Sequence, residues 1–226
     1  MRQEERNMEK RGHIKGLIWD MDGTLLNTLD DIIGVCNETL KAWGLPEKPK
    51  AEMTMYIGYG AKYLCHKSSG LEGDDLMAFL REYRGRTLTR DDPQTKVYDG
   101  IEGILERTKR QGMKLGIYTN KPQFWCEKLA KKFFKPGTLD GIVGVEEGKV
   151  LKPKPDGIVQ MCRAWGIGTD EVVMIGDTPV DWETAKNTGC LGVCVTWGFR
   201  SREYLENAGI SEIVETADEL ERWLSG

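Results

Sequence analysis

The sequence predicts an α/β fold, in which a parallel sheet is covered by helices and a second, all-helical part is inserted near its start. Two observations predict the sheet: short apolar segments that end at turn residues, and amphipathic helical patterns between them. Strands that alternate with helices along a chain typically form a parallel sheet with helices on both faces. A third observation predicts the insertion, because residues 29–92 contain helical patterns only.

Five segments are predicted to be strands, because each is a short apolar run that ends at polar or Gly-containing turn residues. They are Gly16–Trp19, Lys114–Thr119, Gly141–Val145, Val172–Ile175 and Leu191–Thr196, of which Gly141–Val145 has the weakest pattern. Right-handed crossovers between parallel strands place the loops that follow them along one edge of the sheet. We therefore expect the residues after these strands to gather at that edge.

Helical periodicity fills the intervals between the strands. One apolar stripe spans Ile101–Thr108 and stops at Gln111-Gly112, and a second spans Ile158–Trp165 and stops at Gly166. Glycine directly after such a stripe is typical of a helix C-terminus, because glycine adopts the left-handed conformation that ends many helices. These segments are expected to cover the sheet.

The inserted part shows three helical patterns. The first spans Ile32–Trp43 and ends at Gly44, a second helix is expected over Tyr59–Lys67, and a third carries Leu76–Tyr83. An insertion directly after the first strand would lie over the loops at the sheet edge, in the position of a lid. The expected division is a charged, disordered tail at residues 1–13, an α/β core at 14–28 and 93–226, and a helical cap at 29–92.

Composition and charge exclude several other classes of protein. The chain of 226 residues has a formal net charge of −4, which gives no support to nucleic acid or a membrane surface as the main partner. No apolar run approaches the roughly 18 residues of a membrane-spanning helix, and the first residues lack the apolar segment of a signal peptide. The six cysteines form no CxxC pair, so we expect free, mostly buried thiols. A cytoplasmic monomer or homodimer is expected.

Polar side chains follow the strands at four places. They are Asp20, Asp22 and Thr24 after the first strand, Thr119-Asn120, the segment Lys152–Asp156, and Asp177 and Asp181 after Val172–Ile175. Residues i and i+2 of a strand point to the same side, so Asp20 and Asp22 can reach one site at the carboxyl end, where open α/β sheets bind ligands. Two close carboxylates repel, so such a pair usually indicates a bound cation, a shared proton or both.

This set of groups matches the needs of phosphoryl transfer, in which catalysis is mostly positioning and charge neutralisation. Asp20 and Asp177 can supply the oxygen ligands that Mg²⁺ prefers. The hydroxyl of Thr119 and the ammonium of Lys152 can hold phosphate oxygens. One carboxylate can attack phosphorus to form an aspartyl-phosphate, while a neighbouring one protonates the leaving oxygen and later activates water.

Each motif taken alone also has a purely structural explanation. Gly176–Pro179 could be an ordinary turn, and Thr119-Asn120 could cap a helix. Lys152–Pro155 could be an extended, solvated segment, and Asp20–Gly23 could be part of a calcium loop, although the ligands that should follow are absent. The order of the four motifs and their places at strand ends favour the functional interpretation.

These motifs resemble those of the haloacid dehalogenase superfamily, and the resemblance runs from about residue 14 to the end of the chain. The matching motifs are Asp20–Thr24, Thr119-Asn120, Lys152, and Gly176-Asp177 with Asp181. Several linking segments are similar to the phosphoglycolate phosphatase branch: Tyr56–Gly60, Val97–Gly100, Tyr118–Lys121 and Val195–Phe199. Dehalogenases of this superfamily lack an acid at the position of Asp22, so the resemblance points to phosphate esters.

The resemblance implies a Rossmann-like core with a helical cap, and a Mg²⁺-dependent phosphatase acting on a small phosphorylated metabolite such as phosphoglycolate. It implies that Asp20 is the nucleophile and a metal ligand. It implies that Asp22 is the general acid and base and lends its main-chain oxygen to the metal. Asp177 would be a metal ligand, and Asp181 would bind the metal or steady its waters.

The same resemblance assigns the substrate contacts. Thr119 would bind the phosphoryl oxygens with Asn120 nearby, and Lys152 would tie the phosphoryl group to the nucleophile. Specificity is expected in the cap, where Gly58 and Lys62 are the candidate substrate contacts.

Alternative functions stay open. A phosphomutase of the β-phosphoglucomutase type shares the core motifs but returns the phosphoryl group to the sugar, and a pyrophosphatase or nucleotidase of the same superfamily would differ only in substrate. A receiver domain of two-component signalling also arranges Asp, Thr and Lys around Mg²⁺. Receiver domains, however, are about half this length and have no helical insertion.

Overall fold

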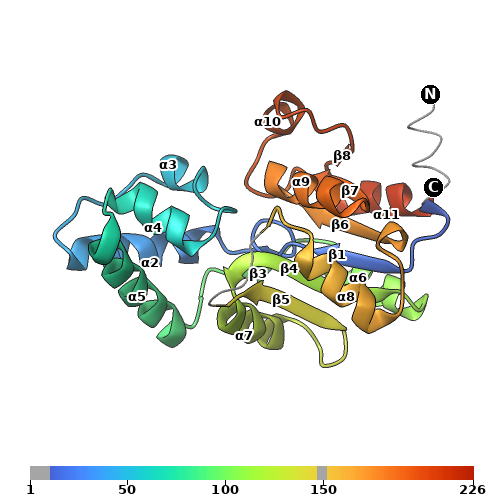
Figure 1. Cartoon of the computed structure of the whole chain (residues 1–226), viewed down its shortest axis with the longest axis horizontal. Helices are drawn as coiled ribbons and strands as arrows, with labels where there is room; N and C mark the ends of the chain where they lie inside the picture. Colours follow the sequence, from blue (N-terminus) through green and yellow to red (C-terminus); the bar gives the residue numbers. More distant parts are fainter. Residues whose placement is uncertain (1–10, 147–151) are drawn as a thin grey trace.

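The computed structural model describes residues 11–146 and 152–226. Within these residues, a six-stranded sheet with helices on both faces forms one part, and a group of helices projects beyond one end of it (Figure 1). Residues 1–10 of the predicted tail lie outside the described part, whereas Arg11 pairs with Glu212 at 2.9 Å and stacks on Trp223. The end of the segment that we predicted as disordered therefore packs against the C-terminal part of the chain.

The strands of the sheet run parallel in the order β5-β4-β1-β6-β7-β8. Their bounds are Gly16–Trp19 (β1), Lys114–Pro122 (β4), Gly141–Val145 (β5), Val172–Gly176 (β6), Leu191–Val195 (β7) and Ile213–Val214 (β8). The five predicted strands are present, and β4 continues past its predicted end to Pro122. Strand β8 was not predicted, because two residues carry too little alternation to be recognised.

The chain order of the strands places β1 at the centre and creates a crossing between β1 and β6. From β1 the chain moves through β4 to β5 and then crosses back to β6 on the other side of β1. Trp19 pairs in register with Ile117 on β4 and with Ile175 on β6. The carboxyl ends of β1 and β6 are therefore nearly level, whereas β4 continues past them to Pro122. Such a crossing is where open α/β sheets bind ligands.

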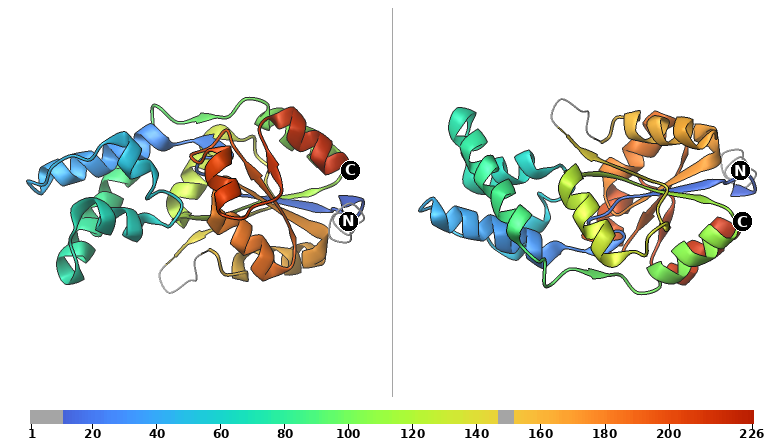
Figure 2. Two further views of the ribbon diagram at one scale, coloured as in Figure 1. Left: turned by 90° about the horizontal axis from the view of Figure 1, so that it is seen from above. Right: turned by 90° about the horizontal axis from the view of Figure 1, so that it is seen from below.

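Helices cover both faces of the sheet (Figure 2). They are α6 (Ile101–Arg110), α7 (Gln123–Phe133) and α11 (Ala217–Ser225) on one face, α8 (Asp156–Trp165) and α9 (Pro179–Thr188) on the other, and α10 (Arg202–Asn207) before β8. On β1, Leu17 and Trp19 point into the first of these layers and Ile18 into the second. A strand buried on both faces must be apolar throughout, which explains the run that ends at Asp20.

The inserted part consists of helices that we call the cap. They are α2 (Leu29–Ala42), α3 (Lys50–Thr54), α4 (Ala61–Ser69) and α5 (Gly73–Thr89). The short α3 was not predicted, and α4 begins at Ala61 rather than Tyr59 because Gly60 has a φ of 90°, far from the helical region. The chain enters and leaves the cap through an antiparallel ribbon of β2 (Leu26–Asn27) and β3 (Lys96–Val97).

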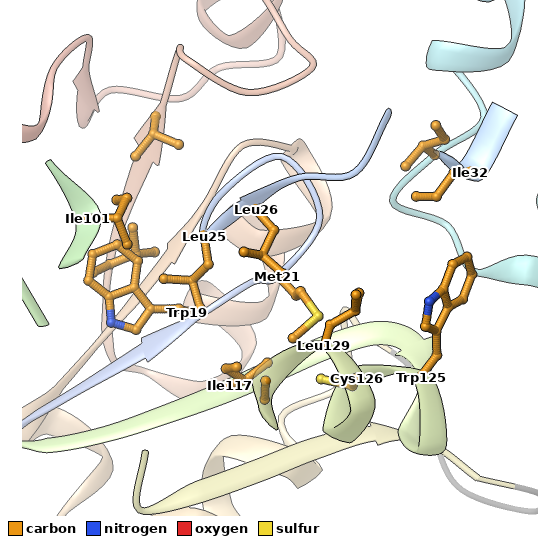
Figure 3. Packing of buried hydrophobic residues seen from close by; sticks show 14 of the residues in the cluster. Trp19, Met21, Leu25, Leu26, Ile32, Ile101, Ile117, Trp125, Cys126 and Leu129 are labelled. Carbon is orange, nitrogen blue, oxygen red and sulfur yellow. The ribbon is translucent and has the colours of Figure 1, made fainter. Parts of the chain in front are cut away.

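The apolar core continues from the sheet into the cap. Trp125 at the start of α7 and Ile32 on α2 face one another (Figure 3). Trp125 also meets Tyr83 of α5 edge-on, with ring centroids 6.4 Å apart. Aromatic pairs of this kind add about 0.5–1.5 kcal/mol beyond the burial of their area, so Trp125 stabilises the docking of the cap.

Two expectations from composition are met in the described part of the chain. The cysteines form no disulfide there, and all except Cys190 are buried. Across residues 11–146 and 152–226, no helix combines the length and apolar character needed to cross a bilayer.

Candidate active site

Asp20 follows β1 directly and is buried, with 3% of its surface exposed. Its main-chain N–H donates to the carbonyl of Ile175 at 2.8 Å, so the pairing of β1 with β6 fixes the backbone at this point. Its Oδ1 accepts hydrogen bonds from the N–H of Met21 at 2.7 Å and from the ammonium of Lys152 at 2.9 Å. The carboxylate is therefore held in one orientation by a sequence neighbour and by a distant lysine.

Asp177 and Asp181 lie beside Asp20. One carboxylate oxygen of each of the three residues lies within 4.8 Å of the others, and all three side chains are buried. Asp177 follows β6, and its Oδ2 accepts the N–H of Phe199 at 2.7 Å. Asp181 lies in the first turn of α9, where its Oδ2 accepts the N–H and the hydroxyl of Thr178 at 3.1 and 2.7 Å. Asp181 therefore caps a helix and belongs to the acidic cluster at the same time.

Burial and mutual repulsion oppose the ionisation of these carboxyl groups. Burial, followed by the charges of Asp181 and Asp20, raises the pKa of Asp177 to about 8. Burial likewise raises the pKa of Asp20 to about 6, against the opposing charge of Lys152. Three close, buried carboxylate oxygens fit a hard divalent cation such as Mg²⁺, which prefers oxygen ligands and offsets their repulsion.

Lys152 supplies a buried positive charge to this cluster. Its Nζ lies 2.9 Å from Oδ1 of Asp20 and 2.5 Å from Oδ1 of Asp181. Burial alone would lower the pKa of Lys152, but the charges of Asp181 and Asp20 raise it above its ordinary value, so the side chain stays an ammonium. Lys152 thus links the carboxylate that follows β1 to the one that caps α9.

Asp22 lies two residues beyond Asp20 in different surroundings. Its Oδ1 accepts the hydroxyl of Thr28 at 2.7 Å and the ammonium of Lys121 at 2.9 Å, and its Oδ2 lies 3.2 Å from the same ammonium. The carboxylate of Asp22 is not part of the acidic cluster, and the predicted contribution of its main-chain oxygen to a metal stays a prediction. The side chain lines a cleft, where it can exchange a proton with a bound molecule.

Thr119 and Asn120 are buried on β4, and both line the same cleft. The amide of Asn120 donates to the carbonyl of Gly58 in the cap at 2.9 Å and accepts the N–H of Lys152 at 2.8 Å. Gly58 has a φ of 105°, which favours glycine, and a Cβ there would lie 3.1 Å from the methyl group of Thr178. Asn120 therefore ties the cap and the Lys152 segment to β4.

The cleft lies between the carboxyl edge of the sheet and the cap, and the empty space inside it and at its open mouth amounts to about 420 Å³. Its cap wall is formed by Ile32, Ile57, Gly58, Gly60, Ala61, Leu64 and Tyr83. Lys62, a predicted substrate contact, is not in this wall; it is exposed beside Tyr59 and Tyr63 on the outer side of α4. The helical repeat turns Ala61 and Leu64 inward and Lys62 outward, so the structure places Lys62 outside the cleft wall.

Lys121 is a charged residue of the site that the sequence analysis did not select. Its Nζ lies 3.5 Å from the centroid of the Trp125 ring, and only 1% of its side chain is exposed. The signal was its place two residues after Thr119, which puts both on one side if the strand continues. Lysine is rarely buried, so the sequence alone favoured an exposed side chain.

Arg200 was not predicted from the sequence to belong to the site, although it is buried and connects the core to the cap. Its guanidinium donates to main-chain carbonyls of the cap loop that follows α3. The acceptors are Thr54 at 2.8 Å, Met55 at 3.2 Å and Ile57 at 3.0 Å. An arginine in a predicted loop gives no sign of the carbonyls that it will meet, because they come from a distant part of the chain.

The residues before Arg200 pack against the acidic cluster. A Cβ on Gly198 would lie 2.3 Å from the carbonyl oxygen of Gly23 and 2.4 Å from Cβ of Asp177, so only glycine fits without displacement. Trp197 donates its indole N–H to the carbonyl of Thr24 at 3.0 Å. With the N–H of Phe199 on Asp177, these contacts join the loop 197–200 to the cluster on one side and to the cap on the other.

The arrangement therefore provides a buried carboxylate beside an ammonium, a second carboxylate that faces a cleft, and a set of oxygens for a hard cation. These are the groups needed to move a phosphoryl group from an ester to a carboxylate and then to water.

Comparisons with known proteins agree with this chemistry. The family model of haloacid dehalogenase-like hydrolases matches residues 17–195. A phosphoglycolate phosphatase of Aquifex aeolicus is 30% identical over 183 residues, which cover 81% of this chain and 85% of that protein. The pyrophosphatase PpaX of Listeria monocytogenes is 29% identical over 201 residues, covering 86% and 88%. The structure of a predicted phosphatase from Clostridium acetobutylicum has a TM-score of 0.83 at 27% identity, covering 92% and 97%.

Proposed function

Because the chain belongs to the haloacid dehalogenase-like hydrolases and is similar to phosphatases over most of its length, we propose that it hydrolyses the phosphate ester of a small metabolite. The reaction would pass through an aspartyl-phosphate on Asp20, with Mg²⁺ as the cofactor. Phosphoglycolate is the first candidate substrate.

The observation that carries this proposal is the contrast between the surroundings of Asp20 and Asp22. Both carboxyl groups line the cleft, but Asp20 is buried beside Lys152 and the acidic cluster, whereas Asp22 bonds to Thr28 and Lys121. Two carboxyl groups in different environments are suited to different roles in one reaction. This contrast supports Asp20 as the nucleophile and Asp22 as the acid and base.

In the first step, an oxygen of Asp20 attacks phosphorus, and the bond between phosphorus and the ester oxygen breaks. Protonated Asp22 gives its proton to the departing oxygen, so the alcohol leaves as a neutral hydroxyl. Lys152 faces Asp20 at 2.9 Å and can neutralise charge on the phosphoryl oxygens, as can the hydroxyl of Thr119. The products of this step are the free alcohol and phosphorylated Asp20.

In the second step, ionised Asp22 removes a proton from water, and the water oxygen attacks phosphorus. The bond between phosphorus and Asp20 breaks, which releases inorganic phosphate and restores both side chains. The apolar cap wall of the cleft excludes bulk water, which strengthens the electrostatic contacts inside.

Mg²⁺ would be held by Asp20 and Asp177, with Asp181 beside them, and would neutralise negative charge on the phosphoryl group. The bonds that Asp181 makes to Thr178 and Lys152 suit it to steady the site rather than to supply the main ligand.

Pyrophosphate is the second candidate substrate, supported by the similarity to PpaX over most of both chains. A leaving phosphate needs a protonated group less than an alkoxide does, so the same residues would serve.

The test is the release of inorganic phosphate from phosphoglycolate, pyrophosphate, a sugar phosphate and a nucleoside monophosphate, with Mg²⁺ or with EDTA. We expect release that requires Mg²⁺ and that Asp20→Asn abolishes. Absence of phosphate from every compound would overturn the proposal, and an isomerised sugar phosphate without free phosphate would indicate a mutase.

A further inference from the structure

Resting on the proposed function, we infer that Lys121 binds an anionic group on the leaving portion of the substrate and thereby selects esters that carry a second negative charge. The class of substrate is a phosphate joined to a short leaving group with a carboxylate, or to a second phosphate. The inference assigns specificity to a residue of β4 rather than to the cap lysine, Lys62.

The first support is the place of Lys121 relative to Asp22. The general acid must lie close to the leaving oxygen, and Nζ of Lys121 lies 2.9 and 3.2 Å from the two carboxylate oxygens of Asp22. An anionic group attached one carbon away from the leaving oxygen would therefore lie within reach of the ammonium.

The second support is the division of charges across the site. Lys152 faces Asp20 and Asp181 and does not line the cleft, so it serves the phosphoryl side. Among the described residues that line the cleft, Lys121 is the one with a positive charge, and the cap wall opposite is mainly apolar. A charge has its greatest effect where water is excluded, so Lys121 dominates the electrostatics of the leaving-group side.

The third support is the rigidity of Lys121. The ammonium lies over the face of Trp125, and the indole N–H of Trp125 donates to the buried carboxylate of Asp92 at 3.2 Å. Cation–π contact of this kind strengthens when it is desolvated. Figure 3 shows Trp125 directed toward Ile32 of the cap, so the ring is held from both sides. Lys121 is thus preorganised, which reduces the entropic cost of binding an anion.

An ammonium has three N–H donors and no acceptor, so Lys121 can bind Asp22 and a ligand anion at once. The exposed Lys62 lacks these features: it is solvated and lies outside the cleft. The two lysines therefore form a matched pair for an experiment, one buried in the cleft and one on the outer side of the cap.

The experiment compares Lys121→Met with Lys62→Met and uses pairs of substrates that differ in the charge of the leaving group. The values of kcat/KM are measured for phosphoglycolate, pyrophosphate and ethyl phosphate. We expect Lys121→Met to lower the ratio of phosphoglycolate to ethyl phosphate by at least about tenfold, mainly through KM, as the loss of one charge-assisted contact predicts. Lys62→Met should leave that ratio unchanged.

The ratio separates binding from a structural role, because a general loss of packing around Asp22 would lower both values together. Equal losses on both substrates, or a change of ratio only in Lys62→Met, would overturn the inference. A fall confined to pyrophosphate would identify a second phosphate, and one confined to phosphoglycolate a carboxylate, as the anion that Lys121 binds.

A binding measurement keeps the inference testable apart from turnover. Phosphonopropionate carries a methylene in place of the ester oxygen of phosphoglycolate, and propylphosphonate lacks the carboxylate. With Mg²⁺ present, calorimetry should give a preference for phosphonopropionate in the wild type that Lys121→Met removes. Preserved preference in a folded Lys121→Met protein would overturn the inference, and a wild type without phosphatase activity would overturn only the proposed function.

Discussion

Asp20 and Asp22 are separated by a single residue, yet their side chains have different surroundings. Asp20 is paired with Lys152 next to two further carboxylates, and Asp22 is paired with Lys121 at the wall of the cleft. Alternation along β1 predicted that both would reach one site. It could not predict their partners, because those come from residues about a hundred positions further on.

The first prediction concerns Asp22. Asp22→Asn removes the proposed proton donor while it keeps the shape of the side chain, so kcat should fall by about 10²–10⁴-fold, the usual contribution of general acid–base catalysis. A substrate with a good leaving group, such as a nitrophenyl phosphate, should lose much less in the first step. Steady-state and burst kinetics on the two kinds of ester measure this difference.

The matched control is Asp20→Asn, which should abolish turnover on both esters because the proposed phosphoenzyme cannot form. If Asp22→Asn reduced both esters equally and showed no burst, Asp22 would not be the acid.

The second prediction concerns pH and the metal. The fold raises the pKa of Asp177 from 3.8 to about 8, so the metal-free fold favours the protonated form. The stabilisation that this gives is complete at pH values below 3.8 and is lost as the pH rises through about 8. The proposed Mg²⁺ would bind the ionised form, so it should raise the Tm more at about pH 8 than at about pH 5.

Thermal unfolding with Mg²⁺ or EDTA at the two pH values checks this prediction, and Asp177→Asn is the control because it cannot ionise. The metal-free control should lose less stability than the wild type between the two pH values. An equal rise in Tm from Mg²⁺ at both values would contradict the prediction.

The sequence was enough to identify some of the residues of the site but not others. The order of the motifs was enough to select Asp20, Asp22, Thr119, Lys152 and Asp177, because each follows or ends a recognisable strand. The structure reversed the expectation for Lys62, whose helical position turns it outward, and added Lys121, whose burial depends on Trp125.

At the scale of secondary-structure elements, the sequence analysis identified five of the strands and several helices, but the helices α7, α9 and α11 were not among its predictions. Helices α2, α5, α6 and α8 carry apolar stripes, and their positions were predicted. No local sequence pattern predicts the short elements, because they depend on contacts with distant partners. These elements are β2, β3, β8 and α3. The alignment of Trp19 with Ile117 on β4 and with Ile175 on β6 followed from parallel pairing once the strands were identified.

The third prediction concerns the contact between the loop after β7 and the cap. Arg200→Met keeps the side-chain stem but removes the donors to Thr54, Met55 and Ile57. Leaving the buried carbonyl of Ile57 without a donor should lower the free energy of unfolding by about 1–3 kcal/mol. Hydrogen exchange in the cap loop 54–58 should become faster, and KM should rise because the cap docks less well.

Arg202→Met is the matched control for this prediction. Arg202 is two residues away, and its ion pairs with Glu206 and Glu215 are exposed, so their loss should cost little. The same change in exchange at residues 54–58 in both variants would show that Arg200 does not hold the cap.

At the scale of the whole molecule, the two connections to the cap are tied to each other. Asp31 on α2 accepts hydrogen bonds from the N–H of Gln94 at 3.0 Å and from the hydroxyl of Thr95 at 2.7 Å. The segment that enters the cap is therefore bonded to the segment that leaves it. Together with the β2–β3 ribbon, this joins the cap to the core through a single short junction. The proposed division at residues 29–92 places its boundaries at this junction.

The fourth prediction concerns the size of the substrate. The cap forms one wall of the cleft, so a large leaving group would keep the cap from docking and would admit water. We expect kcat/KM to fall by at least about tenfold from phosphoglycolate to a nucleoside monophosphate, since tenfold corresponds to the loss of only a modest contact energy. Kinetics on esters of increasing size measure this trend, and equal values across the series would contradict it.

The loop 197–200 would couple the binding of a cation at the acidic cluster to the docking of the cap. Phe199 bonds to Asp177 in the acidic cluster, and the next residue, Arg200, bonds to the cap. Whatever shifts this loop alters both contacts, and free energies of binding are reciprocal: if docking of the cap tightens the hold on a cation, the cation must favour docking by the same amount. Ion affinity measured without a substrate analogue would then understate the affinity during catalysis, and the enzyme would release its ion most readily while it stands open between turnovers.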